Sequence, residues 1–263
     1  MIVASLWVGD KLTRLEKLSI QSFLNLGYEF HLYTYNFVNG VPENTIIKDA
    51  NEIMPHEEIF ELSSSFLPFS DIWRYKMLYE KGGYWVDLDM IAVRPFNFGH
   101  DEYVISSERT IKQGAFKSIL DYVPNIGILK APIHSPFYLE LYNKCRDFNN
   151  TNQNHDKLKY MRIFRKMVKK YKYEKYIKPP NYFCPINWWN AKEAFLSLNE
   201  GESLPKKYGV TGCGRENIIS QGDTYTCHFW RDRATTKYGM DLNLVYPNSI
   251  YESVVEFNGD YII

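Results

Sequence analysis

Two aspartates, Asp87 and Asp89, lie one residue apart directly after the stretch Gly-Gly-Tyr-Trp-Val at 82–86. Side chains on a regular strand alternate between its two faces, so we expect both carboxylates to point the same way. Two like charges on an otherwise apolar strand repel each other and lose hydration, which favours a compensating cation. Mg²⁺ and Mn²⁺ take oxygen ligands and bridge carboxylates to diphosphates. The pattern therefore predicts a metal–diphosphate site at a strand end, and the alternative is a polar turn with two solvated aspartates.

The segment before this strand has the features of a helix over 69–81. Pro68 lies near its start, where proline is tolerated, and Gly82 lies where a helix commonly ends. Asp71 and Arg74 are three residues apart and can share one helix face. An acidic and a basic group held beside the carboxylates could bind hydroxyls or phosphates. The alternative is a surface ion pair that contributes only a few tenths of a kcal/mol.

The combined pattern S-D-x-x-R-Y-x-x-L-Y-x-x-G-G-x-(aromatic)-x-D-x-D, over 70–89, resembles the sugar-nucleotide-binding DXD region of glycosyltransferases. It is most similar to the family of Och1-like mannosyltransferases and capsular-polysaccharide transferases, and the clostridial glucosylating toxins share the signature. The matched residues are Ser70, Asp71, Arg74, Tyr75, Leu78, Tyr79, Gly82, Gly83, Trp85, Asp87 and Asp89.

The resemblance implies a single GT-A-like (Rossmann-like) α/β domain with hexosyltransferase-type activity. Such an enzyme moves a sugar from a nucleotide-diphosphate sugar to a glycan or glycolipid acceptor, with retention of the anomeric configuration. The implied cofactor is Mn²⁺ or Mg²⁺, and the implied donor is a nucleotide sugar, with a UDP-sugar favoured over a GDP-sugar.

Shorter similarities extend the resemblance towards both ends of the chain. Residues 2–9 resemble the family's first strand, which ends at Trp7 here. Residues 124–131 resemble its Asn-containing strand, with Asn125, and 225–230 resemble its late His-x-Trp segment, with His228 and Trp230. The family's late pattern His-x-x-x-Ser-Trp is not intact, because the chain continues Arg-Asp-Arg at 231–233.

The resemblance also implies which residues bind the metal and the nucleotide. Asp89 would ligate the metal, Asp87 would contact the metal or the ribose, and His228 would complete the coordination. Trp7 would stack on the nucleotide base, with Trp85 near the nucleotide. The structural alternatives are core aromatic side chains for the two tryptophans and a hydrogen-bonded strand histidine for His228.

For the sugar, the resemblance implies that Asp71 and Arg74 hold donor hydroxyls and phosphate. Asn125 matches an asparagine near the anomeric carbon, and its alternative is an ordinary hydrogen bond at a strand end. The sequence singles out no residue as a general base.

Alternating strands and helices make up most of the chain. This alternation predicts an α/β fold with a mostly parallel mixed sheet flanked by helices, and the ligand crevice of such sheets lies at the carboxyl ends of the strands. We expect one glycosyltransferase domain over 1–263, with a nucleotide-sugar-binding half at 1–130 and an acceptor-side half at 131–263. The segment 42–66 is expected to be irregular with short helical pieces. Strands are expected at 2–8, 28–34, 84–87, 91–93, 103–107, 126–130 and 224–230, and helices at 11–26, 69–81, 136–148 and 191–198.

The composition agrees with one large domain, because 263 residues of which 45% are hydrophobic can build a sizeable core. The apolar run 2–8 is too short for a signal peptide or a membrane span. The four cysteines are scattered without a Cys-x-x-Cys pair, which indicates neither a zinc cluster nor a disulfide framework. These features predict a cytoplasmic protein.

The segment 157–178 is strongly basic, with ten basic residues and one acidic residue in a chain of net charge zero. Its apolar residues recur at helical spacing, which predicts a basic amphipathic helix. One interpretation is peripheral docking on an anionic membrane, where each basic residue contributes about 1 kcal/mol, and this would suit a lipid-linked acceptor. The alternative is a surface helix whose apolar face packs on the core. Nucleic acid is not expected as a partner, because no nucleic-acid-binding module is recognisable.

Three other classes of protein remain as alternatives. A glycoside hydrolase uses paired carboxylates without a metal. A nucleotidyltransferase acting on sugar phosphates would use a similar metal–phosphate site but release pyrophosphate. A non-catalytic sugar-binding protein would need neither metal nor nucleotide.

Overall fold

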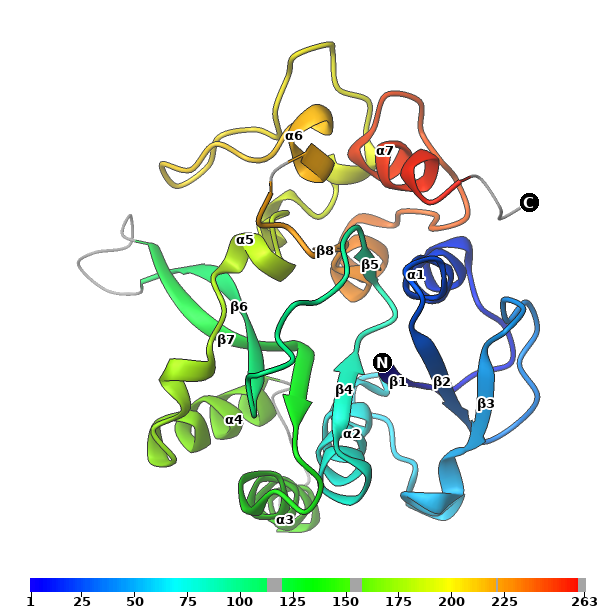
Figure 1. Cartoon of the computed structure of the whole chain (residues 1–263), viewed down its shortest axis with the longest axis vertical. Helices are drawn as coiled ribbons and strands as arrows, with labels where there is room; N and C mark the ends of the chain where they lie inside the picture. Colours follow the sequence, from blue (N-terminus) through cyan, green and yellow to red (C-terminus); the bar gives the residue numbers. More distant parts are fainter. Residues whose placement is uncertain (113–119, 152–157, 221, 260–263) are drawn as a thin grey trace.

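The computed structural model describes residues 1–112, 120–151, 158–220 and 222–259. Its main sheet has six strands in the order β3-β2-β1-β4-β7-β6, and β5 and β8 form a small second sheet (Figure 1). The strands are β1 (Ile2–Trp7), β2 (Glu29–Thr34), β3 (Ile46–Asp49), β4 (Gly83–Val86), β5 (Met90–Ala92), β6 (Val104–Ile111), β7 (Leu120–Ala131) and β8 (Thr226–His228). The helices are α1 (Arg14–Asn25), α2 (Leu67–Lys81), α3 (Pro136–Thr151), α4 (Leu158–Lys170), α5 (Pro180–Phe183), α6 (Arg215–Ser220) and α7 (Ile250–Phe257).

The main sheet is mixed and mostly parallel, as the sequence predicts. Strands β3, β2, β1 and β4 run parallel to one another. Strand β7 pairs antiparallel with β4 on one side and with β6 on the other. The carboxyl ends of β1 and β4 therefore meet at one edge of the sheet, the edge at which ligands bind in folds of this kind.

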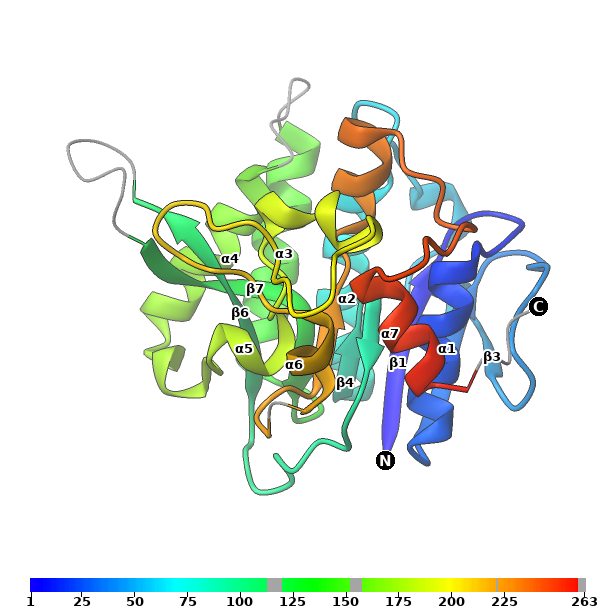
Figure 2. The same cartoon turned by 90° about the horizontal axis from the view of Figure 1, so that it is seen from above.

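Helices cover both faces of the sheet, because successive strand residues point to opposite sides. On β4, Trp85 packs into a cluster with α2, α3 and α4, whereas Tyr84 and Val86 pack into a cluster with α1. A third cluster joins α1 to β5, β8, α6 and α7. Figure 2 shows α1 and α7 side by side, with α2 beyond the strands from them. The C-terminal part of the chain is thereby held against the strand ends.

The sharp junction between α2 and β4 delivers the two aspartates to the sheet edge. Gly82 closes α2 with φ +64°, a conformation that side chains disfavour, and a Cβ there would lie 2.7 Å from the backbone nitrogen of Ile133. Strand β4 ends at Val86, and the Met90 N–H donates to the Asp87 carbonyl at 3.1 Å in a tight turn. The prediction of a regular strand through Asp87 is therefore wrong by one residue, because the chain turns there.

Three local predictions need correction. The segment 191–198 forms only a 3₁₀ turn at Glu193–Phe195, because the Leu198 N–H donates to the Asn248 carbonyl and ties the chain to a distant loop. Strand β3 lies inside 42–66, where exposed Ile46 and Ile47 conceal the alternation typical of a half-buried strand. Helices α6 and α7 were not predicted at all.

The basic helix is shorter than the predicted 157–178. It spans Leu158–Lys170 and cannot continue beyond Lys172, which has φ +56°; Lys157 lies outside the described residues. The apolar face of α4 is buried, with Phe164 stacked on Tyr75 of α2 at 6.1 Å between ring centroids. Core packing thus accounts for its amphipathic pattern, and membrane docking stays a prediction. None of the described helices is long and apolar enough to cross a membrane.

Candidate functional site

Arg74 lies at the centre of a buried group of polar and charged residues beside the end of β4. Its Nη1 donates to the Asp87 Oδ1 at 2.8 Å and to the Ile126 carbonyl at 3.0 Å. Its Nη2 lies 3.1 Å from the Asp71 Oδ1, and both Nη2 and Nε contact Ser70. The side chain is only 3% exposed, so these contacts leave its guanidinium fully engaged within the protein. The predicted Asp71–Arg74 pair is therefore a buried ion pair and not a surface one.

The aromatic neighbour of Arg74 is Trp85. The guanidinium of Arg74 lies over its ring at 4.6 Å, and the indole N–H donates to the Asp87 Oδ1 at 2.8 Å. Trp85 is 1% exposed, so its ring is a core aromatic, and its polar edge orients Asp87.

Burial dominates the ionisation of the two carboxylates around Arg74. It raises the pKa of Asp71 to about 7, although Arg74 pulls in the opposite direction and Asp87 adds to the increase. The pKa of Asp87 is also raised by burial, against the opposing effect of Arg74. Both groups are thus costly to hold ionised without further positive charge.

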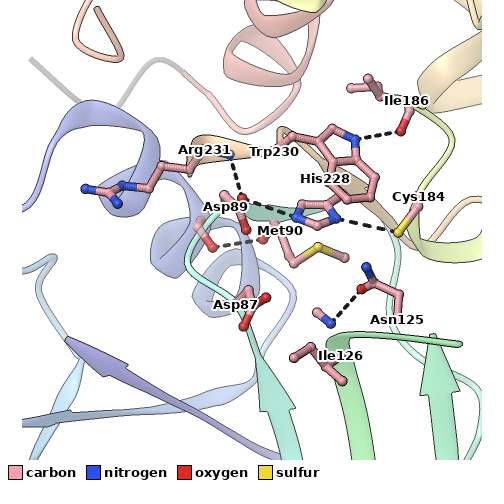
Figure 3. Close-up of polar contacts among 12 residues, drawn as sticks. Asp87, Asp89, Met90, Asn125, Ile126, Cys184, Ile186, His228, Trp230 and Arg231 are labelled. Atoms are coloured by element: carbon pink, nitrogen blue, oxygen red, sulfur yellow. Dashed lines mark hydrogen bonds and ion pairs between the residues drawn. The ribbon is translucent and has the colours of Figure 1, made fainter. Parts of the chain in front are cut away.

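Asp89 is held by the last residue of β8 and the segment that follows it. Its Oδ2 accepts from the His228 Nε2 at 3.2 Å and from the Arg231 N–H at 2.8 Å, and its carbonyl accepts from the Phe229 N–H. Burial opposes its ionisation, but His228 and Arg231 hold its pKa below the ordinary value. Burial likewise opposes the charge on His228, yet Asp89 holds the pKa of His228 well above its ordinary value. Figure 3 shows this segment wrapped around Asp89.

The imidazole of His228 is fixed on three sides. Besides Asp89 at Nε2, it meets the Cys184 Sγ at 3.6 Å from Nδ1 and stacks on Trp230 at 3.8 Å between centroids (Figure 3). Trp230 has φ +53°, a strained conformation that turns the Arg231 N–H back towards Asp89. Its indole N–H is held by the Ile186 carbonyl at 2.9 Å.

Asp87, Asp89 and His228 together can hold a divalent cation. One ligand atom from each lies within 4.8 Å of the others. Carboxylate oxygens with one imidazole suit Mn²⁺ and related ions. Beside them, Gly127 keeps space open, since a Cβ there would lie 3.7 Å from the Asp87 Oδ2 and 3.1 Å from the Met90 Sδ. The donor set therefore fits the predicted cation site.

Asn125 lies on the next strand of the sheet, beside these groups. Its Oδ1 accepts from the Gly127 N–H at 2.7 Å, and its Nδ2 donates to the Glu108 Oε2 at 2.7 Å. Figure 3 shows its amide pointing towards Cys184 and His228.

Trp7 lies at the end of β1, half-buried. Its indole nitrogen is buried and makes no hydrogen bond with the described residues. The guanidinium of Arg231 lies 5.1 Å from the Trp7 ring and pairs with the fully buried Glu16 at the start of α1. Arg231 thus links the segment that contacts Asp89 to the residue predicted to stack on the base.

The structure brings Asp71, Arg74, Asp87, Asp89 and His228 into one connected group through Arg74 and Asp89. Four further residues of this region were not predicted, because their contacts join distant stretches of the chain. Trp230 was noted only for its place in the late motif. The missed residues are Glu16, Glu108, Cys184 and Arg231.

A comparison with protein families gives a match that covers Asp87 and Asp89. Residues 14–111 match the family model described as a glycosyltransferase sugar-binding region containing a DXD motif. The match includes Asp71, Arg74, Asp87 and Asp89, whereas Trp7, Asn125 and His228 lie outside it.

Similarity to solved structures is also found. The chain is similar to the PaToxG glycosyltransferase, with 15% identity over 65% of this chain and 69% of that chain, at a TM-score of 0.45. No curated protein matches the sequence.

Proposed function

We propose that this glycosyltransferase uses a divalent cation, Mn²⁺ or Mg²⁺, to bind a nucleotide-diphosphate sugar at the end of β4, with a UDP-sugar favoured over a GDP-sugar. The convergence of Asp87, Asp89 and His228 within 4.8 Å, at the end of the family-matched strand, carries the proposal. The acceptor is a glycan or a glycolipid, and transfer retains the anomeric configuration.

In this proposal the site works through charges that the protein has already arranged. Asp89, Asp87 and His228 would hold the cation, which on binding acts as a Lewis acid towards the departing nucleoside diphosphate. Arg74, whose guanidinium is taken up by protein groups, keeps Asp71 and Asp87 in place more than it grips the donor. Asp71, with one oxygen near Arg74, is left to accept a hydrogen bond from a sugar hydroxyl.

Trp7 and Asn125 complete the proposed donor site. The Trp7 ring at the end of β1 offers a face for the base, and Trp85 supports the nucleotide side by orienting Asp87. The Asn125 Nδ2 donates one hydrogen to Glu108, and its second hydrogen would face the donor near the anomeric carbon. The half 1–130 would then bind the donor, and 131–263 would close over it with His228 and supply the acceptor side.

The place of action belongs to the same proposal. All four cysteines are unpaired, which suits a reducing compartment, and we propose that the enzyme acts in the cytoplasm. Contact with an anionic membrane would use the exposed lysines of α4, since its apolar face is buried.

A thermal-shift panel of UDP- and GDP-sugars, with and without Mn²⁺, tests the proposal. A ligand that binds only the folded protein raises its melting temperature by mass action. We expect a Mn²⁺-dependent increase with one sugar nucleotide, absent in Asp89→Ala and in the more conservative Asp89→Asn, and kept in the surface control Asp147→Ala. Release of a nucleoside diphosphate excludes a nucleotidyltransferase, which would release pyrophosphate. If no sugar nucleotide shifts the folded wild type, the proposal is wrong and a metal-free binding or hydrolytic role takes its place.

A further inference from the structure

The basic helix α4 has a polar contact that leads into the candidate site. The Arg165 Nη2 donates to the Glu108 Oε1 at 3.2 Å, and its Nε donates to the Pro124 carbonyl at 3.1 Å. The second oxygen of Glu108 accepts from the Asn125 Nδ2 at 2.7 Å. A continuous path of polar contacts thus runs from α4 through Glu108 to Asn125.

These contacts allow only one orientation of the Asn125 amide. Its Oδ1 faces a donor, the Gly127 N–H, and its Nδ2 faces an acceptor, the Glu108 carboxylate. A flipped amide would set donor against donor at Gly127 and acceptor against acceptor at Glu108. Glu108 therefore decides which atom of Asn125 points into the site.

A bulge in β7, opposite Ser106 of β6, brings Asn125 beside Glu108. The register of β6 against β7 shifts between Ile105 and Ser107, and such bulges re-aim side chains near functional sites. Ser106, opposite the bulge, donates to the Asn125 carbonyl at 3.1 Å and accepts from the Ile128 N–H at 3.1 Å. Glu108 is 16% exposed at its side chain, and its two oxygens are divided between Arg165 and Asn125.

We propose that Glu108 and Arg165 are positioning residues that lock the Asn125 amide for transfer of the sugar, and that α4 serves the reaction by supplying Arg165. This inference rests on the proposed function. It assigns the basic helix an internal role that does not depend on a membrane. Neither residue needs to touch the donor, because both act through Asn125.

The test measures donor affinity and turnover separately. Hydrolysis of the donor identified by the thermal-shift panel, in which water replaces the acceptor, gives kcat without knowledge of the acceptor. In Glu108→Ala and Arg165→Ala we expect kcat to fall about 10- to 100-fold, as for a small misplacement of a catalytic group. The dissociation constant of the donor should change less than about threefold. Lys166→Ala, which removes an exposed charge from the same helix, should behave as wild type.

Two further variants keep the result interpretable. Glu108→Gln has one acceptor atom for two donors, so it should lose activity despite its near-identical size. The double variant Glu108→Ala/Arg165→Ala should be no worse than either single variant, because both act on one group. If Glu108→Ala fails to fold, the turnover of Arg165→Ala tests the inference alone. Arg165 is partly exposed, so its removal should leave the fold intact.

Wild-type turnover in Arg165→Ala overturns the inference and leaves the proposed function standing. A parallel fall of kcat and donor affinity also overturns it, because that is the signature of general disruption. A wild type that binds and hydrolyses no sugar nucleotide refutes the proposed function and this inference with it.

Discussion

Replacing Arg74 with methionine should destabilise the protein strongly, and more at neutral than at acidic pH. The substitution keeps most of the side-chain volume but removes the guanidinium that faces Asp71 at 3.1 Å and Asp87 at 2.8 Å. Both carboxylates would remain at the buried site without their cation. Breaking a buried ion pair by removing one partner costs about 3–5 kcal/mol. For a domain of this size we expect the melting temperature to fall by roughly 6–20 °C.

The pH dependence follows from the direction of the carboxyl pKa values. The pKa of Asp71 is already raised to about 7 by burial, against the pull of Arg74, so losing Arg74 raises it further. When the pKa of a carboxyl is higher in the folded than in the unfolded protein, its contribution to stability is fully present below the unfolded-state pKa. That contribution is lost as the pH rises through the folded-state pKa. The deficit of Arg74→Met against wild type should therefore be largest near pH 8 and shrink towards pH 4.

Chemical denaturation of wild type, Arg74→Met and Arg74→Lys between pH 4 and pH 8 measures this effect. Lysine keeps the charge but loses the planar fork, so its deficit should be smaller than that of methionine. A loss below about 1 kcal/mol in Arg74→Met, or a loss that does not vary with pH, would refute the role of Arg74 as the cation of this buried cluster.

Three further outcomes are expected. Mn²⁺ affinity should rise from pH 6 to pH 8, because Asp89 raises the pKa of His228 and the ring must lose a proton to bind metal. If titration calorimetry finds an affinity that does not change with pH, the assignment of His228 as a ligand is contradicted. Gly127→Ala should weaken Mn²⁺ and donor binding, since its Cβ would lie 3.1 Å from the Asn125 Oδ1 and 3.7 Å from the Asp87 Oδ2. The control Gly99→Ala, where a Cβ meets open space, should bind both as the wild type does. Equal binding by the two variants would show that the space beside Gly127 is not used. If α4 docks on membranes, sedimentation with phosphatidylserine vesicles should be salt-sensitive; no binding at low salt excludes that prediction.

Short-range patterns made much of the fold and the placement of the aspartates and Arg74 predictable. Asp87 and Asp89 follow β4 directly, and the i,i+3 spacing of Asp71 and Arg74 places them on one turn of α2. The alternation of strands and helices likewise indicated the mixed, mostly parallel sheet. The predicted helix over 191–198 failed because tertiary hydrogen bonding, and not local propensity, sets the path of that segment.

Contacts between distant segments could not be predicted in the same way. Glu108 lies 57 residues from Arg165, and Cys184 lies 44 residues from His228, so no local spacing connects either pair. The bulge that places Asn125 beside Glu108 depends on the register between two strands, which their sequences do not display. One signal was available, because the departure from the family's late pattern at 231–233 marked the place where Arg231 contacts Asp89.

Anomalous diffraction from crystals grown with Mn²⁺ and the donor tests the central claim most directly. The account predicts one strong manganese peak bounded by Asp87, Asp89 and His228, with the nucleotide diphosphate on its open side. A nucleotide bound elsewhere, or one bound here while His228 remains paired with Asp89 and no metal lies between them, would contradict it.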